Sequence, residues 1–116
     1  MIKKLFSILK NGGVDVYMAG KKQGKCTKAY VSIKEDKSEM SLTGKGIYTY
    51  FSVILVSPLD NYCALDAIHN KVDTAIEGSK FKFFGSESEE VSEDGYIRTL
   101  TYRRFKRRKI NGSKKS

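Results

Sequence analysis

Apolar residues in the first ten positions recur at the spacing of one helical face. This pattern predicts a helix over residues 1–10, which the glycines that follow would end. Helical spacing returns over residues 61–77, where Asp60 or Asn61 would cap the first turn and a glycine would follow the last. Two amphipathic helices are therefore expected. Their apolar stripes are Ile2, Leu5, Phe6 and Leu9 in the first, and Tyr62, Leu65, Ile68, Val72 and Ile76 in the second.

Between the two helices the apolar positions change to a period of two, which is the spacing of a strand. A short run at residues 14–18 and an alternating run at 28–34 predict two strands. The strongest strand signal spans residues 47–57, whose two faces are both apolar, and Pro58 would end it. We expect this strand at the centre of a sheet, covered on both sides. The polar residues 36–46 before it predict a mobile loop.

After the second helix the chain alternates again. Phenylalanines at positions 81, 83 and 84 predict a short aromatic strand, and residues 96–107 predict the last strand. The acidic residues 86–94 between them predict a solvated hairpin loop. Two helices packed on a four- to five-stranded, mostly antiparallel sheet would bury both stripes, which is an α+β architecture. We expect a single domain over residues 1–107, with the extended loop and a basic C-terminal tail at 108–116.

Charge is concentrated at one end of the chain. The 116 residues include 22 basic and 13 acidic ones, which gives a net charge of +9. Residues 98–116 contain nine cations and no acid, so the rest of the chain is neutral. Such a dense positive segment lowers its free energy by binding an anionic partner, whether nucleic acid, lipid or an acidic protein surface. The cations expected to bind a partner are Arg103, Arg104, Lys106, Arg107, Arg108 and Lys109.

Candidate catalytic and metal-binding residues are few. His69 has Asp66 at i−3 and Asp73 at i+4, a spacing that suits a metal but that a solvated helix face also produces. Cys26 lies among lysines, which could lower the pKa of its thiol, and Cys63 is poorly spaced to pair with His69. Free thiols in a reducing compartment are favoured over a disulfide. The sequence predicts no catalytic residue, no metal and no cofactor, and its longest apolar run is too short to span a membrane.

Tyrosine and arginine, which are enriched in protein interfaces, are distributed unusually along the last strand. Arg98 lies between Tyr96 and Leu100, on a face that otherwise belongs in a core. A contact with another protein would explain this position. The alternative is that Arg98 extends its charged end into solvent at the edge of the sheet. The expected subunit interface consists of Tyr48, Tyr50, Tyr96, Arg98 and Tyr102.

Two segments of the sequence resemble a known family. The first is YFSVILVSP at residues 50–58, followed by Tyr62 and Leu65 at the start of a helix, and the second is EDGYIRTLTY at residues 93–102. Together they are similar to the small tail-terminator or tail-completion (head-tail joining) proteins of long-tailed bacteriophages and phage-tail-like bacteriocins. The resemblance covers residues 14–106. The basic end beyond Phe105 is not part of the family's pattern.

This resemblance implies a structural protein of a virion or phage-tail-like particle, assembled in the bacterial cytoplasm, and not an enzyme. It implies α+β protomers in a hexameric ring at the head-proximal end of a tail tube, where the ring ends polymerisation and provides a docking face. The partners would be other copies of the chain, tail-tube subunits, and neck or sheath proteins. From its charge, the basic segment at residues 103–109 is expected to continue the last strand and reach an adjacent subunit, tube or sheath, with DNA as a secondary partner. A ring requires heterologous contacts that close by rotation.

A small basic nucleic-acid-binding module is the alternative function. In that case tyrosines on the sheet would stack on bases while the tail binds phosphates. The apolar faces of residues 47–56 favour burial over stacking. A small enzyme that uses Cys26, or the set of Asp66, His69 and Asp73, is a third hypothesis.

Overall fold

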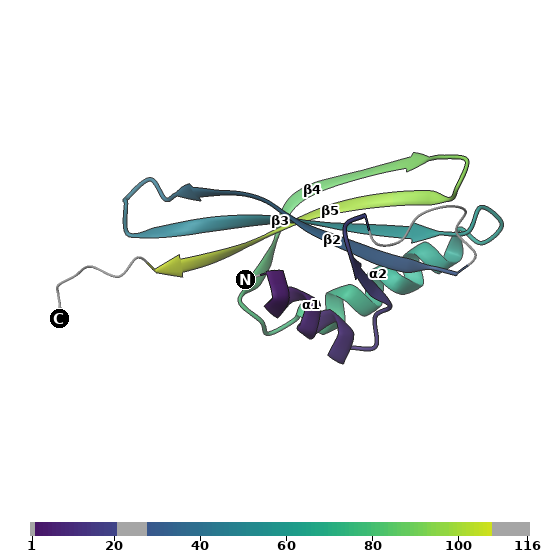
Figure 1. The fold of residues 1–116 in the computed structure, drawn as a ribbon, viewed down its shortest axis with the longest axis horizontal. Helices are drawn as coiled ribbons and strands as arrows, with labels where there is room; N and C mark the ends of the chain where they lie inside the picture. The colour runs from purple at the N-terminus through teal and green to yellow at the C-terminus, as the bar shows by residue number, and fades with distance from the viewer. Residues whose placement is uncertain (1, 21–27, 108–116) are drawn as a thin grey trace.

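The computed structural model describes residues 2–20 and 28–107, which form a sheet with two helices against it (Figure 1). The sheet has five strands in the order β1-β2-β3-β5-β4, and every pair is antiparallel except β1 with β2. The predicted α+β class, with two helices and a mostly antiparallel sheet, is confirmed. The elements are α1 (Ile2–Asn11), β1 (Val16–Met18), β2 (Tyr30–Met40), β3 (Gly46–Ser57), α2 (Cys63–Ile76), β4 (Phe81–Val91) and β5 (Tyr96–Arg107).

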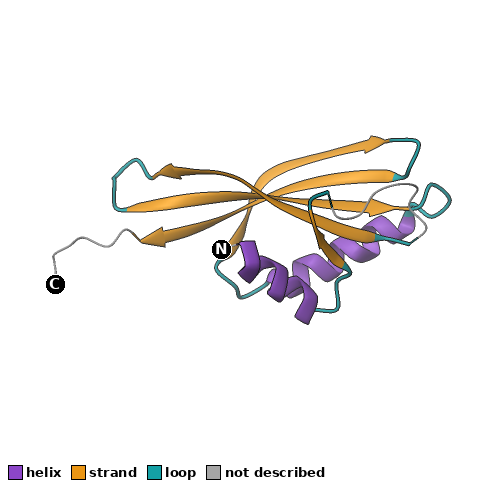
Figure 2. Cartoon of the chain, viewed as in Figure 1, coloured by secondary structure: helices purple, strands orange, loops and turns teal. Residues whose placement is uncertain are grey.

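Both helices lie on the same side of the sheet, as Figure 2 shows. The core lies between these layers, and its largest fully buried side chain is Phe51 on β3. Burial of each such side chain stabilises the fold by about 1.5–3 kcal/mol. The helices approach closely at Gly12, where an added Cβ would collide with Ala75. The other fully buried core residues are Leu5, Leu9, Val31, Ile33, Val53, Leu55, Leu65, Val72 and Leu100.

Strand β3 occupies the predicted central position, but the helices cover only one of its faces. On the opposite, helix-free face the apolar side chains pack against their own cross-strand neighbours. Tyr30 and Val56 are buried there, with Ile54 and Ile97 packed beside them. The second apolar face of β3 therefore reflects packing within the sheet rather than a second layer.

The predicted mobile loop at residues 36–46 is wrong. Strand β2 continues to Met40 and pairs with β3 as far as Ile47, so the turn spans only residues 41–45. A β-bulge at Asp36 interrupts the pairing, and the hydroxyl of Ser52 donates to its carboxylate at 2.6 Å. Residues 37–40 are exposed on both faces, so they show no apolar alternation, although their backbone pairs as in any strand.

The predicted acidic hairpin loop at residues 86–94 is also wrong. Strand β4 runs to Val91 and is paired with β5 through Tyr96, leaving only residues 92–95 in the turn. One acidic side chain of this edge strand, that of Glu89, faces a cation on its neighbour, because Glu89 is opposite Arg98. Opposite charges across two strands favour this pairing despite the low strand propensity of glutamate.

Helix α2 begins two residues later than predicted and is not capped by Asp60 or Asn61. Tyr62 occupies the N-cap position in an αR conformation, without a side-chain hydrogen bond to the first turn. The preceding turn instead uses backbone bonds, in which the amide of Asn61 donates to the carbonyl of Pro58 at 3.1 Å. The last strand ends at Arg107, as the sequence predicts, and the basic tail at 108–116 lies outside the described residues.

Part of the sheet projects beyond the helices. Residues 37–40, 46–50 and 103–107 of β2, β3 and β5 form an extension, visible at the left of Figure 1, that borders β4 and α1 only at its inner end, around Arg103 and Arg104. We name this extension the wing. It contributes to an elongated molecule with principal extents of 56 × 25 × 23 Å.

Candidate functional site

The helix-free face of the wing carries an arginine between two aromatic rings. The guanidinium of Arg103 lies 4.2 Å from the ring centre of Tyr48 and 4.6 Å from that of Phe84. Tyr48 also contacts Phe105, and Tyr50 contacts Phe84, each with ring centres 5.0 Å apart. We name these five residues the aromatic-arginine cluster. Stacking holds the planar guanidinium in one orientation, while Phe84 remains 46% exposed.

The end of the wing is apolar and exposed. Met40 is 56% exposed, Leu42 in the turn is fully exposed, and Ile47 is exposed on the strand that follows the turn. We name these three residues the wing tip. The cations Lys106 and Arg107 on β5 are exposed beside it, opposite Ile47 and Gly46. Apolar side chains surrounded by polar ones on a projecting surface are typical of a docking site.

A second polar centre lies under the helices. Arg98 on β5 is only 6% exposed, although it is a charged residue in the interior of the sheet. Its guanidinium lies 2.9 Å from the carboxylate of Asp66 and 3.5 Å from that of Glu89. It also donates to the hydroxyl of Tyr62 at 3.4 Å. Burial lowers the pKa of Arg98, but the hydrogen bonds to Asp66 and Tyr62 and the charge of Glu89 outweigh burial and raise it.

Tyr62 and Glu89 are coupled through a short hydrogen bond. The phenol of Tyr62 donates to the carboxylate of Glu89 at 2.6 Å. This bond, followed by the nearby charge of Arg98, lowers the pKa of Glu89. The same bond raises the pKa of Tyr62. Both shifts favour a protonated phenol beside an ionised carboxylate, which is the state that links α2 to the sheet at neutral pH.

The Asp66, His69 and Asp73 set faces β5. The guanidinium of Arg98 donates to Nδ1 of His69 at 2.9 Å, so that nitrogen carries no proton. Tyr102 donates its hydroxyl to Asp73 at 3.1 Å. Among the side chains that the structure describes, no group of three His, Cys, Asp or Glu residues is arranged to bind a metal. The set therefore forms the polar side of the contact between α2 and β5.

The remaining sequence candidates are separate from these centres. Cys63 is a free, exposed thiol at the start of α2, and Cys26 lies outside the described residues. None of the described helices is long and apolar enough to cross a bilayer.

The five residues expected at a subunit interface do not share one surface. Tyr48 and Tyr50 lie on the helix-free face of the wing, whereas Tyr96, Arg98 and Tyr102 lie on the face that the helices cover. Tyr102 is 2% exposed and packs within the protomer. Arg98 is not at the sheet edge, because β5 has neighbours on both sides.

The expected cationic set divides in the same way. Arg103 and Arg104 are half-buried and stack on aromatic rings, whereas Lys106 and Arg107 are exposed. Arg108 and Lys109 lie outside the described residues. The sequence reasoning missed Phe84, Met40 and Leu42 as surface residues. The strand alternation that places Arg103 and Phe105 on one face was the available signal for the aromatic-arginine cluster.

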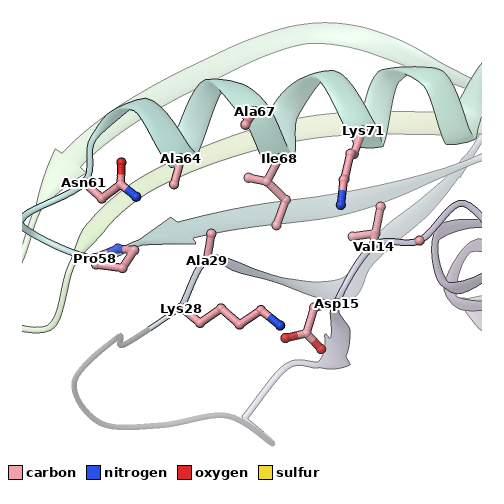
Figure 3. Close-up of a pocket in the computed structure, with 11 residues that line it drawn as sticks. Val14, Asp15, Lys28, Ala29, Pro58, Asn61, Ala64, Ala67, Ile68 and Lys71 are labelled. Carbon is pink, nitrogen blue, oxygen red and sulfur yellow. The ribbon is translucent and has the colours of Figure 1, made fainter.

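A small cavity of about 380 Å³ lies between α2 and the β1–β2 side of the sheet (Figure 3). Ala64 and Ala67 leave space along the helix, and Figure 3 shows the ends of Lys28 and Asp15 directed toward each other at the opposite wall. Its charged groups are of both signs, so this cavity does not select one charge of ligand.

No protein-family model matches the sequence, and no characterised protein matches it significantly. The fold is similar to that of a chain in a solved structure described as "Virion of native gene transfer agent (GTA) particle". The two chains are 19% identical, with a TM-score of 0.62, and the match covers 90% of this chain and 84% of the other. The two chains therefore share a fold over nearly their whole lengths.

Proposed function

We propose that this chain is a structural subunit of a phage-like particle. It forms a ring on the head-proximal end of a tail tube, ends tube polymerisation there, and provides the face on which neck or sheath proteins dock. The shared fold with a chain of a gene transfer agent virion supports this proposal. So do the segments at residues 50–58 and 93–102, which resemble tail-terminator proteins. The particle would assemble in the bacterial cytoplasm.

The main structural support for this proposal is the wing. A sheet that extends past its helices gains little core, and it exposes three apolar side chains at its tip. Such a surface is stabilised when a partner removes it from water. Tube subunits would bury Met40, Leu42 and Ile47, while Lys106 and Arg107 contact acidic groups around them. The aromatic-arginine cluster would hold β3 and β5 of the wing against β4 before docking, which lowers the entropy cost of binding.

The proposal is tested by mixing the purified chain with tail-tube subunits of its particle and measuring tube lengths by electron microscopy. The chain is expected to bind tube ends and to stop growth. Leu42→Asp should abolish end binding without loss of fold, because Leu42 is a fully exposed turn residue. Leu59→Asp is the matched control, an exposed apolar residue outside the wing. A wild-type chain that leaves tube growth unchanged contradicts the proposal.

Binding of single-stranded nucleic acid is a second candidate function, and the aromatic-arginine cluster favours it. Exposed rings beside arginine on an open sheet face are the arrangement on which bases stack. In that case an oligonucleotide titration followed by fluorescence anisotropy would show tight, salt-dependent binding. Phe84→Ala should weaken it, and Val91→Ala, an exposed residue at the other end of β4, should not. Tube capping without oligonucleotide binding would exclude this candidate.

A further inference from the structure

A cationic cavity lies apart from the wing tip, between α1 and the start of β4. Its volume is about 520 Å³, and its walls include no acidic residue. Side chains of Ile8 and Phe81 supply apolar surface. Four cations surround this surface, two from α1 and two from the sheet side. They are Lys3, Lys4, Lys80 and Arg104.

One of these cations has an unused donor. Nε of Arg104 is buried and has no hydrogen-bond partner within residues 2–20 and 28–107. The guanidinium lies 5.7 Å from the ring centre of Phe81, which holds it against the cavity wall. A buried donor without an acceptor costs free energy. An acidic ligand in the cavity would therefore gain an arginine that is already positioned.

The complementary surface occurs on the same chain, at the opposite end of β4. The end of β4 and the turn that follows it present Glu90, Glu93 and Asp94, all exposed, around Val91, which is 67% exposed. We name these four residues the acidic hairpin. The turn is ordered by backbone bonds, since the amide of Ser92 donates to the carbonyl of Gly95 at 2.9 Å. The ion pairs of the described residues do not involve its three acids.

The two surfaces cannot meet within one protomer. Phe81 begins β4 opposite Arg104 and Val91 ends it opposite Tyr96, so the length of paired strand between them separates the two surfaces by about 26 Å. We propose that the acidic hairpin of one copy docks in the cationic cavity of the next copy, with Val91 against the apolar wall and the acids on the surrounding cations. This proposal names the subunit contact of the ring proposed above and so rests on that function. The contact joins two different patches, which is the heterologous type that generates rings.

Charge complementarity favours a second copy over another occupant. An apolar residue flanked by acids matches an apolar wall flanked by cations, and like charges at such a contact cost several kcal/mol. Each protomer carries both halves of the contact at the two ends of one strand. Successive copies can therefore add in one direction only.

A charge-swap experiment tests the contact. The acid variant is Glu90→Lys with Glu93→Lys, and the base variant is Lys4→Glu with Lys80→Glu. All four positions are exposed, so both variants should fold. Size and mass are measured by analytical ultracentrifugation for each variant alone and for an equimolar mixture, both with and without tube subunits. Matched controls with the same charge changes are Glu35→Lys with Glu77→Lys, and Lys45→Glu with Lys71→Glu.

Each variant alone should associate about 100-fold more weakly than the wild type, since its own two surfaces now repel. The mixture should restore assembly, because each hairpin again meets a cavity of opposite charge, and the controls should assemble normally. Variants that assemble alone, or a mixture that stays dissociated, overturn the proposal. So does a wild-type chain that is monomeric both alone and on tubes. If the wild type assembles through these surfaces but does not bind tubes, only the proposed tail function is contradicted. If both variants still cap tubes, only this subunit contact is contradicted.

Discussion

The half of the sheet under the helices and the wing beyond them are built from the same strands but are stabilised differently. Under the helices, β3 and β5 bury Phe51, Val53 and Leu100 completely. In the wing the same strands expose Ile47 and Phe105 and gain stability from backbone pairing and ring stacking. One strand thus changes from a core element to a surface element along its length. The comparison separates residues that hold the fold from residues that are available to a partner.

The largest test of this comparison truncates one leucine in the core and one isoleucine in the wing. Leu100→Ala should lower the free energy of unfolding by about 2–5 kcal/mol, because it leaves a cavity under α2. Ile47→Ala should change it by less than about 0.5 kcal/mol. Urea denaturation followed by circular dichroism measures both. Equal losses at the two positions would remove the distinction between the halves.

The second test removes the buried charge under the helices. Arg98→Met should cost about 1.5–3 kcal/mol, since it deletes charged hydrogen bonds to Asp66 and Glu89. The loss is limited because both carboxylates are exposed enough to return to water. Arg107→Met, an exposed cation of the wing, is the control and should be neutral within about 0.5 kcal/mol. The same denaturation assay applies, and a more stable Arg98→Met variant would show that desolvation of Arg98 outweighs its partners.

The third test distorts the wing alone. At Gly46 an added Cβ would overlap the ring of Phe105 and lie 2.8 Å from the carbonyl oxygen of Lys106. Gly46→Ala should therefore cost about 1–3 kcal/mol by displacing β5 from β3 at the end of the wing. Amide hydrogen exchange should increase in the wing strands and remain unchanged at core amides such as those of Val53. Lys45→Ala, in the adjoining turn, is the control, and faster exchange throughout the sheet would contradict local distortion.

The smallest expected effect is a pH dependence on the helix-covered side. The hydrogen bond from Tyr62 lowers the pKa of Glu89 in the folded chain, so its contribution to stability is present above the ordinary pKa of a glutamate and is lost as pH falls through the folded pKa. Glu89→Gln should therefore be less stable than the wild type at neutral pH, and the difference should shrink in acid. Unfolding midpoints measured across this range test the prediction. Glu90→Gln, which changes an exposed carboxylate on the same strand, is the matched control.

The sequence pattern predicted the helices and strands that bury one face, and it missed the strand segments whose two faces are both exposed. Residues 96–107 were assigned correctly because Leu100 and Tyr102 alternate with polar residues over a core. Residues 37–40 have water on both faces, so their composition resembles a loop, and only pairing with β3 makes them a strand. The acidic part of β4 was missed for a related reason. The cation that pairs with it lies on a different strand, so only the tertiary structure shows that this segment is a strand.

The candidate sites likewise depend on contacts between separate elements, which the sequence pattern does not show. Arg98 and the polar residues of α2 were each noticed in the sequence, but the contact between them depends on how the helix lies across β5, which spacing along the chain does not specify. The aromatic-arginine cluster joins residues from three strands. Its members became neighbours only through the register that pairs Tyr50 with Arg103.

The bulge at Asp36 sets how the wing can vary in length. Asp36 is one extra, unpaired residue on β2, and beyond it each β2 side chain lies on the same face of the sheet as the β3 side chain opposite. Adding or removing a single residue past this point would turn every later side chain to the opposite face, whereas inserting two on each strand of the hairpin would preserve both faces. The reach of the wing can therefore change in steps of about 7 Å without touching the core. Under the function proposed above, hairpin length alone would fit the protomer to tubes of different width.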